Sequence, residues 1–151
     1  MLNPTGSAAP ASRDSDNLQW MHVDLLARPA SDNPLFTVFL EEVGGTRRMP
    51  VVMRKAEADA IAAHLQQMQT SRPLTYAFMA EVVHALGGHV VEARITRTDG
   101  QTIYTSAVIS GHEGTRVIDA RPSDAINLAL RCDAAVRVDP SVFEAMGVAA
   151  S

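Results

Sequence analysis

The chain has 151 residues, 46% of them hydrophobic, and a formal net charge of −4 at pH 7. This balance predicts a globular chain with its own core, and the ten basic and ten acidic side chains of residues 35–131 lack the broad positive charge of a dedicated nucleic-acid-binding module. No apolar run reaches the roughly 20 residues of a membrane helix, and the single cysteine, Cys132, excludes an internal disulfide. We therefore expect a cytoplasmic protein without a membrane partner.

The first third of the chain predicts a disordered tail followed by three strands and a helix. Residues 1–17 are rich in Pro, Ser and Asp, which is typical of a disordered segment, so we expect a single domain at 18–151. Gly44 and Gly45 separate two alternating runs and suit a tight hairpin turn. In chain order the expected elements are strand 19–26, loop 29–34, strands 35–43 and 47–53, and helix 55–69.

The remaining sequence predicts a second helix, a long hairpin and a final strand–helix series. The second helix has Pro73 in its first turn and Gly87-Gly88 at its end. Its apolar stripe consists of Phe78, Met79, Val82, Val83 and Leu86. Asp99-Gly100 between two alternating runs is a strong hairpin signal. The expected elements are helix 73–86, strands 89–98, 101–110 and 115–119, helix 122–131, strand 135–138 and a helical turn at 140–146.

Part of the sequence occurs twice. Residues 49–65 align with residues 114–130 at a constant offset of 65, and each copy reads strand, turn, helix, with Asp-Ala-Ile in the first turns of the helix. We expect Ile61 and Ile126 to occupy equivalent buried positions, and Leu65 and Leu130 likewise. Hairpins beside helices, together with this duplication, predict an α+β fold with a mixed, mostly antiparallel sheet.

Asp119 and Arg121 are the first candidates for a functional site. Asp119 ends a strand, where a carboxylate can project into a cleft, and Arg121 follows on the turn, where a guanidinium can bind phosphate with two hydrogen bonds. The first copy has Arg54 and Ala56 at the equivalent positions, so neither residue repeats. A requirement of the scaffold should recur in both copies, whereas a site that is used once need not.

Asp124 and Glu41 are the other two candidates, and each has a structural alternative. Pro122 at the first helical position places Asp124 at the third, where an acid offsets the helix dipole; Asp59 is its counterpart in the first copy. Glu41 lies on the first hairpin, where surface solvation is the alternative role. Carboxylates of this kind hold Mg²⁺ in many nucleases, although the sequence leaves the metal open.

The chain from residue 35 to residue 148 resembles the bifunctional nuclease (BFN) domain family. The resemblance rests above all on residues 118–131, Ile-Asp-Ala-Arg-Pro-Ser-Asp-Ala-Ile-Asn-Leu-Ala-Leu-Arg, and on shorter motifs in the same order, including Arg72-Pro-Leu-Thr75. It implies an enzyme that acts on both DNA and RNA. The family usually continues with His-Asp after Arg-Pro-Leu-Thr, whereas this chain has Tyr76-Ala77. This chain therefore lacks the His-Asp pair, which could serve as a general base or bind a metal.

We therefore predict a nuclease-like domain that hydrolyses phosphodiester bonds in DNA, RNA or both, with low activity. The candidate site residues are Asp119, Arg121, Asp124 and Glu41. One alternative is a non-catalytic domain of the same fold that binds nucleic acid or associates with itself. Another is a small-anion binder at the start of the helix at Pro122, where free backbone N–H groups meet Arg121.

The long alternating strands at 89–98 and 101–110 bear on assembly. A strand at the edge of a sheet exposes unpaired backbone groups, and pairing with a second copy of the chain covers them. The sequence therefore predicts a homodimer.

Overall fold

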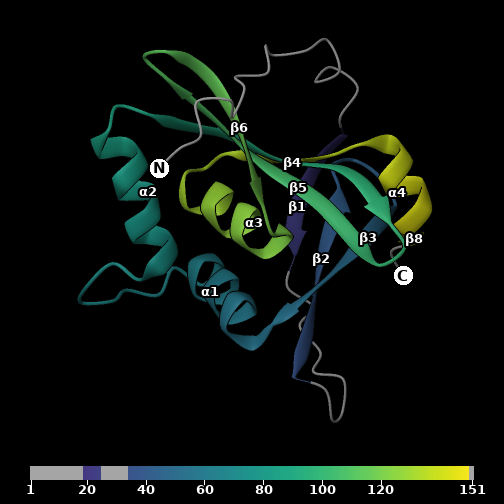
Figure 1. Ribbon diagram of the computed structural model, residues 1–151. Helices are drawn as coiled ribbons and strands as arrows, with labels where there is room; N and C mark the ends of the chain where they lie inside the picture. The colour runs from purple at the N-terminus through teal and green to yellow at the C-terminus, as the bar shows by residue number, and fades with distance from the viewer. Residues whose placement is uncertain (1–18, 25–33, 150–151) are drawn as a thin grey trace.

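The computed structural model describes residues 19–24 and 34–149 (Figure 1). The predicted disordered tail at 1–17 and most of the predicted loop at 29–34 lie outside these residues. The described part of the chain contains eight strands and four helices in the order β1 (Gln19–Asp24), β2 (Leu35–Glu42), β3 (Arg47–Arg54), α1 (Lys55–Leu65), α2 (Thr75–Ala85), β4 (His89–Asp99), β5 (Thr102–Gly111), β6 (Gly114–Ala120), α3 (Pro122–Arg131), β7 (Ala135–Val138), α4 (Pro140–Met146) and β8 (Val148–Ala149).

The described strands form one sheet in the order β6-β5-β4-β7-β1-β2-β3-β8. Every neighbouring pair is antiparallel except β4 and β7, which are parallel. The predicted α+β fold with a mixed, mostly antiparallel sheet is therefore confirmed. Two three-stranded meanders, β1-β2-β3 and β4-β5-β6, are each followed by a helix, α1 and α3. These two helices pack against each other on one face of the sheet (Figure 1).

The repeated sequence forms the last strand and the helix of each meander. Ile61 on α1 and Ile126 on α3 are both 0% exposed and belong to the same hydrophobic core, as the repeat predicts. The prediction for the leucines is wrong, because Leu65 is 42% exposed while Leu130 is half-buried against the core. Leu65 is the last residue of α1, whereas Leu130 is followed by one more helical residue. The two copies therefore share their buried helix starts but not their ends.

Two predicted helix boundaries are wrong. The predicted helix 55–69 ends at Leu65, because Gln67 adopts a φ of 54°, in the left-handed region that terminates helices. The helix predicted from Pro73 begins at Thr75, so Pro73 lies before the helix rather than in its first turn. Gly87, with a φ of 77°, ends α2 as predicted.

The apolar stripe of α2 is largely exposed. Phe78 is 62% exposed and Leu86 is 78% exposed, and Met79 and Val82 are exposed as well. The buried residue of α2 is instead Tyr76, in the first turn of the helix. In this structure the helix therefore turns most of its apolar side chains away from the core.

The strands that suggested self-pairing are interior strands. β4 lies between β5 and β7, and β5 lies between β4 and β6. The two edges of the described sheet are β6 and β8, and the short strand β8 was not predicted. The prediction that β4 and β5 expose unpaired edges, on which the expected homodimer rested, is therefore wrong. β6 pairs with the outer edge of β5, and β7 pairs with the outer edge of β4.

Candidate active site

A pocket of about 790 Å³ opens between helices α1, α2 and α3 and strands β5 and β6. Its walls are mainly apolar and include Leu74, Met79, Val83, Ala107, Ile118 and Leu128. Polar groups also border it, among them Glu57, Tyr76, Asp119, Arg121 and Asp124. The duplicated fold therefore creates this pocket where its two helices meet, with α2 as a third wall.

Pro122 explains why two of these polar side chains meet. β6 ends at Ala120, and Arg121 stays extended, with φ −65° and ψ 147°, as the residue that precedes α3. Pro122 then starts the helix, since its fixed φ suits the first helical position and its missing N–H costs no hydrogen bond there. Arg121 and Asp124 are consequently one turn apart, with their side chains on the same side.

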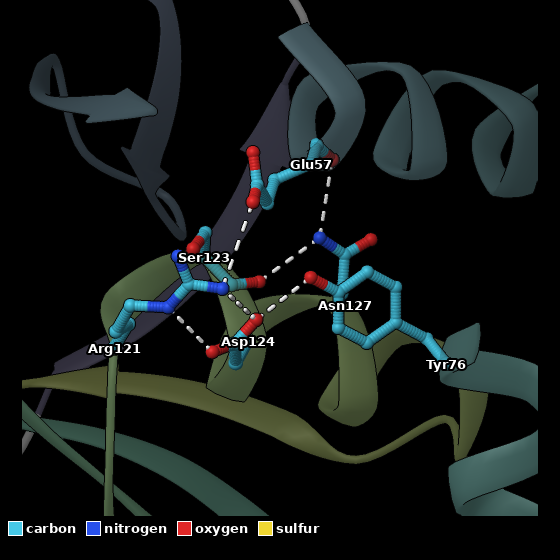
Figure 2. A network of polar contacts seen from close by, with 6 residues as sticks. All are labelled: Glu57, Tyr76, Arg121, Ser123, Asp124 and Asn127. Atoms are coloured by element: carbon cyan, nitrogen blue, oxygen red, sulfur yellow. Dashed lines mark hydrogen bonds and ion pairs between the residues drawn. The ribbon is translucent and has the colours of Figure 1, made fainter. Parts of the chain in front are cut away.

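Arg121 and Asp124 form a two-pronged ion pair (Figure 2). Arg121 Nε donates to Asp124 Oδ2 at 2.8 Å, and Arg121 Nη2 donates to Asp124 Oδ1 at 3.0 Å. The Tyr76 hydroxyl donates to the same Oδ1 at 2.7 Å, so α2 is tied to the start of α3. Arg121 Nη2 also lies 3.6 Å from Glu57 Oε1 on α1. Two carboxylates thus hold one guanidinium that remains 63% exposed.

These contacts set the charge states of the cluster. Burial acts to raise the pKa of the Asp124 carboxyl, but the hydrogen bonds from Arg121 and Tyr76 outweigh it and hold that pKa below its ordinary value. Burial, followed by the hydrogen bond to Asp124, raises the pKa of Tyr76 well above the ordinary value of a phenol. The hydrogen bonds to Asp124 likewise raise the pKa of Arg121. At neutral pH the site therefore holds a carboxylate, a guanidinium and a protonated phenol.

Glu57 and Asn127 join the two copies at the back of the cluster. Asn127 is 1% exposed, and its Nδ2 donates to the backbone oxygen of Glu57 at 3.1 Å and to that of Ser123 at 2.9 Å. The Glu57 side chain is 14% exposed, and its buried Oε2 has no hydrogen-bond partner among the residues that the structure describes. Oε2 is therefore a buried acceptor without a described donor, behind the Arg121 ion pair.

The two aspartates in the duplicated helix starts have different surroundings. Asp59 is exposed and pairs with Lys55 one turn earlier on α1. Asp124 is partly buried and pairs with Arg121 and Tyr76. Asp124 lies in the first turn of α3, as predicted, whereas Asp59 is the fifth residue of α1 and the acid in the first turn of that helix is Glu57. Ser123, also in the first turn of α3, is buried.

Asp119 also borders the pocket, but in a different way. It is exposed, and its side chain makes no hydrogen bond or ion pair within residues 19–24 and 34–149. Ala120 packs against the core, so the alternation of side chains along β6 turns Asp119 to the other side of the strand, at the open edge of the sheet. Its carboxylate is therefore exposed and uncommitted, on a residue that borders the pocket.

Glu41 is not brought to this site. It lies on β2 opposite Arg48, close to the Gly44-Gly45 turn, whereas α1 begins at the other end of the hairpin. Glu41 is half-buried and does not line the pocket. Its neighbour Glu42 pairs with Arg47 at 3.1 Å within the hairpin. Of the four predicted site residues, three thus border one pocket and the fourth is distant.

A tyrosine-to-phenylalanine change tests the coupling between Tyr76 and Asp124. Tyr76→Phe should lower the free energy of unfolding at pH 7 by about 1–2 kcal/mol, since it removes a donor to a partly buried carboxylate. Asp124 has a lowered pKa in the folded state, so its contribution is present above its unfolded pKa of about 3.9 and is lost as pH falls through the folded value. Denaturant titrations across pH should show the wild-type advantage shrinking below about pH 4.

Tyr104→Phe is the matched control for this prediction. Tyr104 is half-buried on β5, where its ring lies under the Arg97 guanidinium at 4.0 Å, and its hydroxyl donates to no carboxylate within the described part of the chain. Its substitution should leave both the stability and its pH profile close to wild type. A loss for Tyr76→Phe that is the same at pH 3 as at pH 7 would contradict the coupling.

The model of the bifunctional nuclease domain matches residues 38–151, about three quarters of the sequence. The chain belongs to the bifunctional nuclease domain family. An uncharacterized protein of Mycobacterium tuberculosis is 31% identical to it over 111 residues, which cover 74% of this chain and 66% of that protein. The rice protein Bifunctional nuclease 2 (Oryza sativa subsp. japonica) is 25% identical over 143 residues, which cover 90% of this chain and 43% of that protein.

The Arabidopsis thaliana protein Bifunctional nuclease 1 is 29% identical over 94 residues, which cover 60% of this chain and 29% of that protein. The bifunctional nuclease domain described here thus spans less than two thirds of the length of these relatives. Within the described residues, no helix is long and apolar enough to span a membrane.

Tyr76 and Glu57 are the two site residues of this bifunctional nuclease domain that sequence reasoning missed. Tyr76 stands where the family usually has the histidine of its His-Asp pair, and the motif alone indicates only that this histidine is missing. Its contact with Asp124 spans 48 positions in the sequence, which no local pattern encodes. Glu57 carried a usable signal, because it lies in a motif shared with the family and in the first turn of the duplicated helix.

Proposed function

We propose that this bifunctional nuclease domain hydrolyses phosphodiester bonds in DNA, RNA or both at the pocket between α1, α2 and α3. One observation carries the proposal: an exposed guanidinium, held in place by two carboxylates, lies at a pocket that an uncommitted carboxylate also borders. Hydrolysis of a phosphodiester needs charge neutralisation at phosphorus and a base for the attacking water. Arg121 and Asp119 are the residues that we assign to these two roles.

Arg121 is suited to holding a phosphate. Its contacts with Asp124 and Glu57 use Nε and Nη2, which leaves the N–H groups of Nη1 for a phosphate oxygen. Because the guanidinium is already oriented, little reorganisation is needed when negative charge develops on the phosphorane-like transition state. The carboxylates of Asp124 and Glu57 offset the positive charge of Arg121, so we expect Arg121 to bind the phosphate of the substrate weakly. We expect its stabilising effect to be strongest in the transition state.

Asp119 is suited to activating the water. In the proposed step a water oxygen attacks phosphorus, Asp119 accepts the proton of that water, and the bond from phosphorus to the leaving oxygen breaks. The leaving oxygen then takes a proton from solvent water. Nothing at Tyr76-Ala77 replaces the His-Asp pair as a general base, and the Tyr76 hydroxyl is engaged with Asp124. A positioned acid or base contributes about 10²–10⁴-fold, which is the reason that we expect slow turnover.

Mg²⁺ is the metal that the proposal allows. Within the described residues, no three or more His, Cys, Asp or Glu side chains are grouped as a metal site. Mg²⁺ is often bound by one or two carboxylates together with waters and substrate phosphates, and Asp119 could supply one such carboxylate. A bound Mg²⁺ would lower the pKa of its water and share the charge of the phosphate with Arg121.

The direct test incubates the purified chain with labelled single- and double-stranded DNA and RNA, with and without EDTA. We expect slow cleavage of at least one polymer, and a loss of cleavage in EDTA that added Mg²⁺ restores. Cleavage that persists in EDTA would show that the reaction needs no metal and that Arg121 and Asp119 suffice for it. No cleavage of any polymer, with Mg²⁺ present and the protein folded, would refute the proposed function.

Self-association is the second candidate function, and the exposed face of α2 favours it. Leu74, Phe78, Val82 and Leu86 are all exposed, and Ile118 on the edge strand β6, across the pocket from α2, is exposed as well. Contiguous exposed apolar side chains often mark protein interfaces. We therefore propose that the chain forms a homodimer through this surface of α2 rather than through the strands β4 and β5.

Light scattering tests the homodimer. The wild-type chain should show about twice the monomer mass of 16.2 kDa at micromolar concentration. The double variant Phe78→Asp, Leu86→Asp should shift the mass to that of the monomer, because each new carboxylate would be buried without a partner in the interface. Val52→Asp, at an exposed apolar position on the unrelated strand β3, is the control and should leave the dimer intact. A wild-type chain with the monomer mass would overturn the prediction.

A further inference from the structure

We infer that the pocket receives one unpaired nucleobase while Arg121 holds the adjoining phosphate, so that the domain selects single-stranded nucleic acid over duplex. This inference rests on the proposed function, because it names the class of substrate for the same site. It follows from the size of the pocket, the chemistry of its walls and the position of its charges.

The size and walls of the pocket suit a flat, largely apolar group. Its volume of about 790 Å³ lies within the range of roughly 300–1,000 Å³ that is usual for sites of small molecules and cofactors. Leu74, Met79 and Val83 form one wall on the α2 side, and Ala107 and Ile118 form the sheet side. The faces of a nucleobase gain free energy when such surfaces remove them from water.

The charges of the pocket favour a nucleotide bound with its phosphate at the rim and its base in the interior. Glu57, Asp119 and Asp124 all border the pocket, so a phosphate inside it would meet carboxylates of the same sign. Arg121 and Arg131 are the cations that line the pocket, and Arg121, with its exposed guanidinium, is the one that can draw a phosphate to the rim. The uncharged base is then the part of the nucleotide that enters.

A duplex fits this arrangement poorly. Bases in a duplex are stacked and paired, and turning one out of the stack costs a few kcal/mol, a cost that an unpaired strand largely avoids. The chain offers little to offset that cost, because its net charge is −4 and residues 35–131 carry equal numbers of basic and acidic side chains. Discrimination of at least about tenfold corresponds to the lower end of this cost.

Binding in EDTA separates this inference from catalysis. Fluorescence anisotropy should be measured with a labelled short single strand, with the same strand carrying abasic sites, and with the matching duplex. The intact single strand should bind at least about tenfold more tightly than either of the other two. Equal affinity for the intact and the abasic strand, or for the strand and the duplex, would overturn the inference.

A pocket-filling variant adds a second readout. Ala60 lines the pocket from α1 and is only half-buried, so Ala60→Phe should occupy the space of the base without disturbing the core. We expect it to reduce binding of the intact strand to the level of the abasic strand, while binding of the abasic strand stays unchanged and reports a folded Arg121 site. Val52→Phe, at an exposed position away from the pocket, should change neither affinity. Ala60→Phe with wild-type affinity for the intact strand would contradict the inference.

The outcomes for the inference and for the proposed function are distinguishable. Binding that depends on the base, without any cleavage when Mg²⁺ is supplied, would support the inference and refute hydrolysis. Cleavage of duplex and abasic substrates at the rate of the intact single strand would support hydrolysis and refute the inference.

Discussion

Arg121→Gln is expected to lower kcat/KM for phosphodiester cleavage by about 100-fold or more. Removing one preorganised donor from a site of developing negative charge commonly has an effect of this size. Glutamine keeps a comparable length and a hydrogen-bonding amide but loses the charge and the fork of N–H groups that bind a carboxylate and a phosphate together. A cleavage assay under conditions of low substrate, where the rate reports kcat/KM, is the measurement.

Arg116→Gln is the matched control for Arg121. Arg116 lies on β6, the strand that Arg121 follows, but it pairs with the exposed Glu113 at 3.1 Å near the hairpin turn and does not line the pocket. Its substitution should leave cleavage within about twofold of wild type, since exposed ion pairs contribute little. Arg121→Gln also leaves Asp124 and Glu57 without their shared cation, so thermal denaturation must accompany the assay. A folded Arg121→Gln protein with wild-type kcat/KM would remove Arg121 from the mechanism.

The second large effect is expected at Asp119, whose role should differ from that of Asp124. Asp119→Asn should abolish cleavage and change the free energy of unfolding by less than about 0.5 kcal/mol, because the side chain is exposed and without a partner among the described residues. Asp124→Asn should instead destabilise the protein by about 1–2 kcal/mol, since it removes the charge that Arg121 and Tyr76 bind, and should keep part of the activity. Cleavage rates and denaturant titrations of the two variants are to be compared side by side.

Glu57→Gln completes this set. Glu57 has one oxygen near Arg121 and one buried oxygen without a described partner, so it is the other carboxylate that could accept a proton. If Asp119→Asn stays active and Glu57→Gln does not, the base is Glu57 and the assignment to Asp119 is wrong. Asp59→Asn, at the exposed counterpart of Asp124 on α1, is the control that should leave both activity and stability close to wild type.

The sequence predicts most of the elements because their signals are local. Gly44, Gly87 and Asp99-Gly100 mark turns, and Pro122 marks the start of α3, each through a backbone preference that does not depend on distant contacts. The repeat predicts the shared burial of Ile61 and Ile126 because both follow the same strand–turn–helix pattern. Where the signal is weaker, as at the end of α1, the predicted boundary fails.

The sequence does not predict how these elements cover one another. An apolar stripe on α2 indicates an amphipathic helix but not which neighbour meets it, and the helix contacts α3 through its first turn instead. Apolar and polar residues alternate similarly in interior and edge strands, so the positions of β4 and β5 in the sheet could not be predicted from their own residues. The site has the same limitation: Asp119, Arg121 and Asp124 are neighbours in one motif, whereas Glu57 and Tyr76 reach them only through the packing of α1 and α2 onto α3.

The order of the strands has a consequence for how the chain can be divided. β7 pairs with β1 and β8 pairs with β3, so the C-terminal part of the chain flanks the first meander on both sides. The segment between α1 and α2, residues 66–74, is exposed throughout. A cut there would yield two fragments that should recombine on mixing through strand pairing and the α1–α3 contact. Glu57 would come from one fragment and Tyr76, Arg121 and Asp124 from the other, so the complete cluster would form only in the recombined protein.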